Sequence, residues 1–209
     1  MLTAFQNFLY TCAISFDLPI LDWIQANLQS GFMDAIWPII TMFGDAGIFW
    51  MIWATLLLFI PKYRRIGLGM WFSLAIGLVI CNLILKPAVG RMRPYDFQIK
   101  ELGKTWNDFL ISGKLLIEEH GDKSFPSGHT IASFEAATVL LLNCPATGIP
   151  AMILAVLVAF SRLYLYVHYP TDVIFSVFAG ILIAIIGNRL AKKFPLDKIK
   201  FLKKGKYER

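Results

Sequence analysis

A histidine and an aspartate four residues apart could form a nucleophilic pair near the carboxyl-terminal end of the chain. His168 and Asp172 lie on either side of Pro170, which disfavours a helix that continues through His168. Asp172 is therefore predicted in the first turn of the next helix, with His168 just ahead of it. A carboxylate in that position can accept the ring N–H of the imidazole, which fixes the tautomer and leaves the other nitrogen able to attack. The alternative is that Asp172 only caps the helix.

A second group of reactive residues stands immediately before the apolar stretch 130–142. Ser127, Gly128 and His129 follow Pro126, and a glycine beside a hydroxyl residue at a helix start lets backbone N–H groups approach a ligand closely. The positive end of the helix dipole adds to this effect, so the pattern predicts an anion site with a titratable imidazole attached. A plain helix start with an incidental histidine is the alternative.

Cations form the third group. Lys86 and Arg93 are seven residues apart at the end of the apolar stretch 66–85, and Arg162 lies at the end of another such stretch. A guanidinium matches the oxygens of a phosphate, and an ammonium supplies a mobile point charge. Taken alone, each cation could equally well touch lipid headgroups, and Arg91 is expected to do only that.

The composition indicates which elements must position these residues. Of the 209 residues, 57% are hydrophobic and 16% are charged, against roughly 45–50% and 25% in soluble proteins. The chain is therefore predicted to be a polytopic membrane protein and not a soluble or disordered one. Three widely spaced cysteines offer neither a disulfide framework nor a zinc pattern, and no metal site or cofactor is expected.

Five stretches approach the length of about 20 apolar residues that a transmembrane helix needs. They are residues 44–60, 66–85, 130–142, 148–166 and 173–190. Residues 1–43 are apolar but interrupted by Asp17, Asp22 and Asp34, which predicts a broken first span, with two interfacial helices as the alternative. The expected fold is an all-α transmembrane helix bundle with five clear spans and a sixth near the amino terminus. We expect one domain over 1–209, with its core at 44–190.

The basic residues predict the orientation in the membrane. Lys62, Arg64 and Arg65 occupy a short turn between two spans, and short basic loops mark the cytoplasmic side. Counting spans from that turn places 86–128 outside and the basic tail 191–209 in the cytoplasm. That tail is interpreted as a lipid-facing anchor and not as a nucleic-acid site. The candidate residues all lie at the outer ends of spans, which predicts an active site at the outer membrane-water boundary.

The outer loop, residues 95–125, contains an apolar pattern that approximates one helical face. It comprises Trp106, Phe109, Leu110, Leu116 and Ile117. This favours a lid or interfacial helix over the site, although a surface loop resting on headgroups fits the pattern as well.

The three groups together resemble the signature of the type 2 phosphatidic acid phosphatase superfamily, which is K-x6-R-P, P-S-G-H and S-R-x5-H-x3-D. The matching segments run from Lys86 to Pro94, from Pro126 to His129 and from Ser161 to Asp172.

The resemblance implies a phosphohydrolase that needs no metal. It implies His168 as the nucleophile that forms a phosphohistidine, Asp172 as its partner and His129 as general acid and base. It also implies a set of residues that bind phosphoryl oxygens: Lys86, Arg93, Ser127, Gly128 and Arg162. Glu135 is outside the signature and is expected to form a hydrogen bond between helices.

For the substrate, the resemblance points to undecaprenyl diphosphate. Phosphatidylglycerophosphate and phosphatidic acid are alternatives, and a lipid-linked phosphotransferase or a non-catalytic lipid-binding or transport protein would share the spans. The expected partners are a membrane lipid phosphate and the bilayer, with no nucleic acid, and the oligomeric state stays open.

Overall fold

The part of the chain that the computed structural model describes, residues 3–118 and 121–195, consists of helices and loops and contains no strand. The prediction of an all-α fold is confirmed for these residues. The amino-terminal half contains α1 (Ala4–Cys12), η1 (Ala13–Asp17), α2 (Leu18–Leu28), α3 (Gly31–Met42), η2 (Asp45–Gly47), α4 (Ile48–Phe59), η3 (Pro61–Tyr63), α5 (Arg64–Gly77), η4 (Leu78–Leu85), α6 (Lys86–Val89) and α7 (Pro94–Lys100). The remainder contains η5 (Trp106–Asp108), α8 (Gly128–Asn143), α9 (Pro145–Tyr164) and α10 (Pro170–Lys193).

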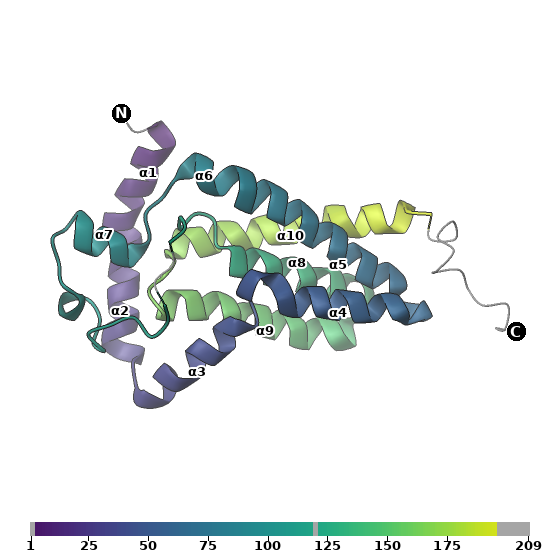
Figure 1. Cartoon of the computed structure of the whole chain (residues 1–209), viewed down its shortest axis with the longest axis horizontal. Helices are drawn as coiled ribbons and strands as arrows, with labels where there is room; N and C mark the ends of the chain where they lie inside the picture. The colour runs from purple at the N-terminus through teal and green to yellow at the C-terminus, as the bar shows by residue number, and fades with distance from the viewer. Residues whose placement is uncertain (1–2, 119–120, 196–209) are drawn as a thin grey trace, which may run out of the picture.

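The helices α4, α5, α8, α9 and α10 run side by side along the long axis of the molecule and form its bundle (Figure 1). Helix α8 packs against α5, α9 and α10. Local sequence signals define where these helices begin. Ser127 caps α8 through its side chain, while Pro145 and Pro170 occupy the first positions of α9 and α10, where the missing N–H costs nothing.

Four helical segments of the described residues are long and apolar enough to cross a membrane. They are Gly31–Phe59, Pro61–Lys100, Pro145–Tyr164 and Pro170–Lys193. They contain four of the predicted spans. The fifth, 130–142, forms α8, which has 16 residues and is therefore about 24 Å long, less than the hydrocarbon core of about 30 Å. Helix α8 is therefore not among the segments long enough to cross a membrane, although it packs among the helices that are. The count of five spans stays a prediction.

Within the described part of residues 1–30 no helix is among the segments long and apolar enough to cross a membrane, so the sixth span near the amino terminus stays a prediction. Helices α1 and α2, joined by η1, lie across one end of the bundle (Figure 1), an arrangement that the alternative of two interfacial helices also fits. Polar contacts help to hold the segment there: Asp22 accepts a hydrogen bond from the Tyr166 hydroxyl at 2.6 Å, and that tyrosine lies in the loop between α9 and α10. The next helix, α3, continues through the kink at η2 into α4.

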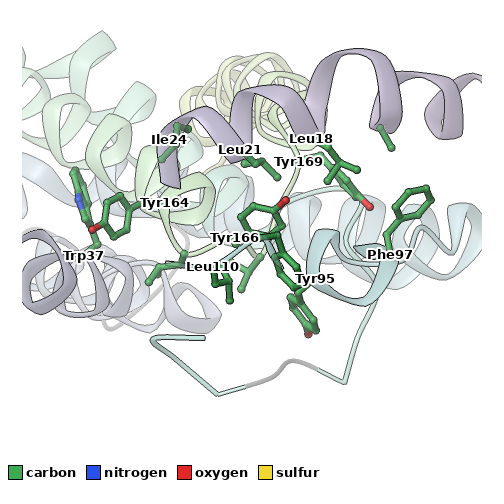
Figure 2. Close-up of a cluster of buried hydrophobic side chains, with 14 residues drawn as sticks. Leu18, Leu21, Ile24, Trp37, Tyr95, Phe97, Leu110, Tyr164, Tyr166 and Tyr169 are labelled. Carbon is green, nitrogen blue, oxygen red and sulfur yellow. The ribbon is translucent and has the colours of Figure 1, made fainter. Parts of the chain in front are cut away.

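Figure 2 shows how α2 is fixed to this end of the bundle. Its apolar side, with Leu18 and Leu21, faces the segment that carries Tyr166 and Tyr169, and all four side chains are buried in one hydrophobic cluster. Burial of large apolar and aromatic side chains is the main source of packing energy at such a contact. The amino-terminal helix therefore rests directly on the loop that precedes α10.

Breaks in helical geometry position the first cationic group. The helix that begins with α5 passes through the π-helical segment η4 into α6 and ends at Gly90, which has φ +64°, a left-handed conformation that suits glycine. Arg93 then has an extended backbone, and Pro94 begins α7. Lys86 and Arg93 therefore stand on two different elements with a sharp turn between them.

The outer loop has less helix than the lid alternative requires. Beyond α7, the described part of 95–125 contains only the 3₁₀ turn η5, in keeping with the surface-loop alternative. Ser112 and Gly113 interrupt the helical pattern, and Phe109 and Leu110 are buried against the same cluster as α2. The predicted tail 191–209 begins inside α10, which extends to Lys193, and its residues from 196 onward lie outside the described part.

Large apolar side chains cover the outside of the bundle. Leu83 and Phe178, for example, are 63% and 69% exposed. Exposed apolar surface on this scale is unusual for a soluble protein and is typical of helices that face lipid tails.

Candidate active site

His168 and Asp172 lie as their spacing predicts. Asp172 is in the first turn of α10 and His168 precedes that helix. The His168 Nδ1 atom is 3.5 Å from Asp172 Oδ2, and the hydroxyl of Ser124 lies 3.4 Å from the same nitrogen and donates a hydrogen bond to the same carboxylate. Because Nδ1 faces Asp172 and Ser124, the other ring nitrogen, Nε2, points towards Arg93.

Arg93 links the imidazole to the outer loop. Its Nη1 atom donates to the Val167 carbonyl at 2.8 Å and lies 3.3 Å from His168 Nε2. Its Nη2 atom and the Lys86 ammonium both bind the Asp122 carboxylate. Two cations that belong to the signature thus converge on one anion next to the candidate nucleophile.

His129 occupies the first turn of α8 and faces the same region. Its Nε2 atom is 2.6 Å from the Asp45 carboxylate of η2, which orients the ring. Gly128 begins α8, and a Cβ added there would contact the Asn82 amide of η4. Ser127 is fully buried, and its hydroxyl lies 3.0 Å from the Thr130 hydroxyl. The Ser127 hydroxyl would have to rotate away from Thr130 to contact a phosphate.

Arg162 is buried at the end of α9, where its Nη1 atom donates to the Thr41 hydroxyl at 2.5 Å. Its charge acts on His168 together with that of Arg93. The structure therefore brings all eight predicted site residues to one end of the bundle. We call this the site end and define it by Lys86, His129 and His168.

A cavity of about 370 Å³ extends from the site end into the apolar interior of the bundle. At the site end it is lined by five of the predicted residues, which are Lys86, Arg93, Gly128, His129 and His168. Deeper in the bundle it is lined by apolar side chains of α4, α5 and η4, which include Met51, Trp71, Leu74 and Leu78. Ser127, Arg162 and Asp172 are buried behind the cavity wall.

The electrostatic surroundings favour a neutral His168. Burial lowers the pKa of His168 well below its usual range, and the positive charges of Arg93, Arg162, Lys86 and His129 lower it further. A neutral imidazole has the free lone pair that nucleophilic attack requires.

The sequence interpretation was wrong about Arg91, which does not lie among headgroups. Its guanidinium is buried and forms ion pairs with Asp172 at 2.5 Å and with Asp17 at 2.7 Å. Asp17, Asp45, Asp122 and Ser124 were likewise not predicted as site residues. For Asp17 the signal was present, because an acidic residue within an apolar stretch needs a partner.

Glu135 does not make the expected interhelical hydrogen bond through Oε1. That atom is buried and has no hydrogen-bond partner among the described residues. Its carboxylate packs against Gly77 of α5, where a Cβ would meet Oε1 at 1.9 Å, and it lines the cavity. Glycine at this position therefore makes room for the carboxyl group.

Comparison with known proteins identifies the family. The model of the PAP2 superfamily matches residues 66–195. The chain belongs to the PAP2 superfamily. This PAP2 protein is 29% identical over 193 residues to an undecaprenyl-diphosphatase of Sulfolobus acidocaldarius, a match that covers 92% of this chain and 86% of the relative. It is 30% identical to a lipid A 1-phosphatase of Rhizobium johnstonii, over 76% of this chain and 69% of the relative.

Two solved structures share the fold of this PAP2 protein. One is a transmembrane PAP2-type phosphatidylglycerolphosphate phosphatase from Bacillus subtilis, with a TM-score of 0.66 and 23% identity over 91% of this chain and 94% of the other. The other is LpxE from Aquifex aeolicus, with a TM-score of 0.62 and 21% identity over 84% and 96%. Family and relatives together make this PAP2 protein a multi-pass membrane lipid phosphatase.

Proposed function

We propose that this enzyme hydrolyses the terminal phosphate of a lipid-linked diphosphate, with undecaprenyl diphosphate as the first candidate. The observation that carries the proposal is the cavity, which joins a cationic, histidine-containing end to an apolar wall formed by α4 and α5. Such a cavity suits a substrate with a phosphorylated head and a hydrocarbon tail. The relative named undecaprenyl-diphosphatase matches over 92% of this chain, which supports undecaprenyl diphosphate as the first candidate.

In the first step, His168 Nε2 attacks the terminal phosphorus, and the bond between that phosphorus and the bridging oxygen breaks. The pair of electrons leaves with the lipid monophosphate, and His129 donates a proton to the leaving oxygen. Asp172 stabilises the positive charge that develops on the imidazole, because its carboxylate lies 3.5 Å from Nδ1. The product of this step is a phosphohistidine.

In the second step, water replaces the imidazole on phosphorus. His129, now neutral, takes a proton from the water, which attacks the phosphohistidine and releases inorganic phosphate. The bond between phosphorus and His168 Nε2 breaks, and the free enzyme is restored. Asp45, 2.6 Å from the ring, holds His129 in place through both steps.

The cations stabilise the charge on the transferred phosphoryl group. Lys86 and Arg93 already bind one anion, the Asp122 carboxylate, and a phosphoryl group would take that place. The Gly128 N–H, the Ser127 hydroxyl and Arg162 are the remaining members of this phosphate site. Fixed donors directed at three equatorial oxygens are the main source of rate enhancement in phosphoryl transfer.

Substrate assays on the purified protein test the proposal. Undecaprenyl diphosphate, phosphatidylglycerophosphate, phosphatidic acid, lipid A and a soluble phosphate ester are compared, with release of inorganic phosphate as the measurement. We expect the diphosphate to give the highest kcat/KM. Cleavage of diacyl lipids alone would contradict the choice of substrate, and transfer of the phosphate to an alcohol without release would make the enzyme a phosphotransferase.

The same assay tests whether a metal is needed. Among residues 3–118 and 121–195 there is no group of three or more His, Cys, Asp or Glu side chains that could hold a metal ion. We expect activity to persist in excess chelator, since the cations of the site supply the positive charge. Activity that disappears with chelator and returns with magnesium would contradict this expectation.

A further inference from the structure

A buried ionic network connects the amino-terminal helix to the candidate catalytic pair. Asp17, the last residue of η1, is fully buried, and its carboxylate accepts three hydrogen bonds. They come from Arg91 Nη2 at 2.7 Å, from the Thr171 backbone N–H at 2.9 Å and from the Thr171 hydroxyl at 2.7 Å. Thr171 is the residue before Asp172, so Asp17 binds the first turn of α10 directly.

Arg91 forms the second link of the network. Its Nη1 atom donates to Asp172 Oδ1 at 2.5 Å and to the Thr171 hydroxyl at 2.8 Å. The guanidinium also lies over the Tyr169 ring, 3.7 Å from its centroid. One planar group therefore bridges two carboxylates, a geometry that arginine provides and lysine does not.

The charges in this network determine the net charge next to the His168 imidazole. Asp17, Arg91 and Asp172 carry two negative charges and one positive charge, which leaves one net negative charge beside His168. Without the charge of Asp17, Arg91 would neutralise Asp172, and in a buried site the attraction between Asp172 and a positively charged imidazole would be largely cancelled.

Among residues 3–118 and 121–195, the other charged groups around His168 are positive or are paired with a cation. Lys86 of α6, Arg93 before α7, His129 of α8 and Arg162 of α9 all act on the ring as positive charges. The neighbouring Asp122 is bound to Lys86 and Arg93. The network on the Asp172 side is thus the source of negative charge next to Nδ1.

We propose that Asp17 is a positioning residue of the active site, which acts through Arg91 and Thr171 to hold Asp172 beside His168 and to preserve its negative charge. The inference rests on the proposed catalytic roles of His168 and Asp172. It assigns a function to a residue outside 66–195, the part of the chain that matches the family model. The packing of α2 on the loop before α10 (Figure 2) holds Asp17, the residue before α2, close to the first turn of α10.

Asp17→Asn tests the proposal, because asparagine has the same shape but carries no charge, and only its amide oxygen can still accept hydrogen bonds. We expect kcat to fall by about 10–100-fold, as is typical when an outer partner of a functional group is lost, while KM changes little. The matched control is Asp22→Asn on α2, which removes the charge from a part-buried contact to Tyr166 but does not touch Arg91. The control should keep kcat within about twofold of wild type while losing a similar amount of thermal stability.

A double variant separates charge from structure. Asp17→Asn combined with Arg91→Gln restores one net negative charge beside His168. We expect kcat of the double variant to be no lower than that of the poorer single variant, since coupled residues are not additive. The proposal would be overturned if the fold-decrease in kcat of the double variant equalled the product of the decreases in the two single variants. It would also be overturned if kcat of Asp17→Asn stayed within twofold of wild type.

An NMR titration of the histidine rings makes the test independent of the substrate. The chain has three histidines, so ¹⁵N-histidine labelling with His129→Ala and His168→Ala variants assigns the His168 signals. Asp17→Asn should lower the pKa of His168 further, and Asp22→Asn should not. If the wild-type protein cleaves no lipid phosphate but the titration shifts, the proposed function fails and the role of Asp17 stands. If it cleaves lipid phosphates and Asp17→Asn changes neither the titration nor kcat, the role of Asp17 is wrong.

Discussion

At the scale of single residues, the site makes a direct prediction about its two histidines. His168→Ala and His168→Gln should both lower kcat by about 10⁴-fold or more and prevent trapping of a phosphoenzyme, because the nucleophile is gone. His129→Ala should slow substrates with poor leaving groups most, since those need protonation. Rapid-quench trapping and a series of phosphate esters of differing leaving-group pKa measure the two effects. Near-normal hydrolysis by both His168 variants would exclude the phosphohistidine.

Asp122 binds Lys86 and Arg93, the two cations that we propose bind the phosphoryl group. Burial raises the pKa of its carboxyl, but hydrogen bonds from Lys86 and Arg93 outweigh this and hold that pKa well below its usual range. The carboxylate is therefore ionised at neutral pH and competes with the substrate for the same cations. Asp122→Asn should lower KM by about three- to tenfold, corresponding to about 1 kcal/mol of lost competition, with little effect on kcat. Initial-rate kinetics check this, and a raised KM would show that Asp122 assists binding.

The pH dependence of the rate follows from the low pKa of His168. If His168 is the nucleophile, as we propose, it must be neutral, so protonation inactivates it only as the pH falls through its folded-state pKa, which lies well below the usual histidine value. We expect kcat/KM to show no inhibitory protonation of the nucleophile near pH 6.5, the ordinary histidine value, and to decline only at lower pH. A pH profile of kcat/KM with a detergent-stable preparation measures this. A decline centred at the ordinary histidine pKa would contradict the assignment.

At the scale of elements, glycines set the distance between α5 and α10. A Cβ at Gly187 of α10 would meet Ser73 Oγ of α5 at 2.3 Å and the Ser73 backbone nitrogen at 2.7 Å. Gly187→Ala should therefore destabilise the protein by about 1–3 kcal/mol through overpacking. Gly31→Ala is the control, because a Cβ there would have nothing within 4 Å. Thermal unfolding in detergent compares the two, and equal melting temperatures would contradict the tight packing.

Sequence reasoning succeeded where local signals determine the structure. The spacing of His168, Pro170 and Asp172 predicts the start of α10, and Ser127 predicts the start of α8, because capping and proline geometry act over a few residues. It did not predict where α1 and α2 lie relative to the bundle. Their position across the end of the bundle depends on contacts such as those between Asp17 and Arg91, 74 residues apart in sequence. An acidic residue in an apolar stretch indicates that a partner exists, but no local pattern identifies which residue it is.

At the scale of the whole molecule, charge is distributed unevenly between the two ends. Arg65 Nη1 donates to the carbonyls of Ala191 and Lys192, both at 3.0 Å, so the turn with Lys62, Arg64 and Arg65 meets the end of α10. This basic end lies opposite the site end (Figure 1). By the positive-inside rule, the basic end belongs in the cytoplasm and the site faces outward, which remains our proposal.

Cysteine labelling of intact cells tests this orientation. In a background without Cys12, Cys81 and Cys144, a cysteine is introduced as Glu101→Cys on the exposed outer loop or as Lys193→Cys at the basic end. A membrane-impermeant maleimide should label the first variant in intact cells and the second only after permeabilisation. The reverse pattern would place the site in the cytoplasm and remove the argument for a carrier lipid that is dephosphorylated outside.

The two walls of the cavity have a consequence for the direction of the reaction. In the reaction that we propose, inorganic phosphate is released at the polar end and diffuses into water, whereas the dephosphorylated lipid stays against α4 and α5 and returns to the bilayer. The two products enter different phases, so they rarely meet again in one active site, and the reverse reaction is suppressed by dilution. On this proposal, phosphate reaches the cations as an inhibitor from the aqueous side of the site end, so the phosphate concentration of that single compartment would govern how fast the lipid substrate is dephosphorylated.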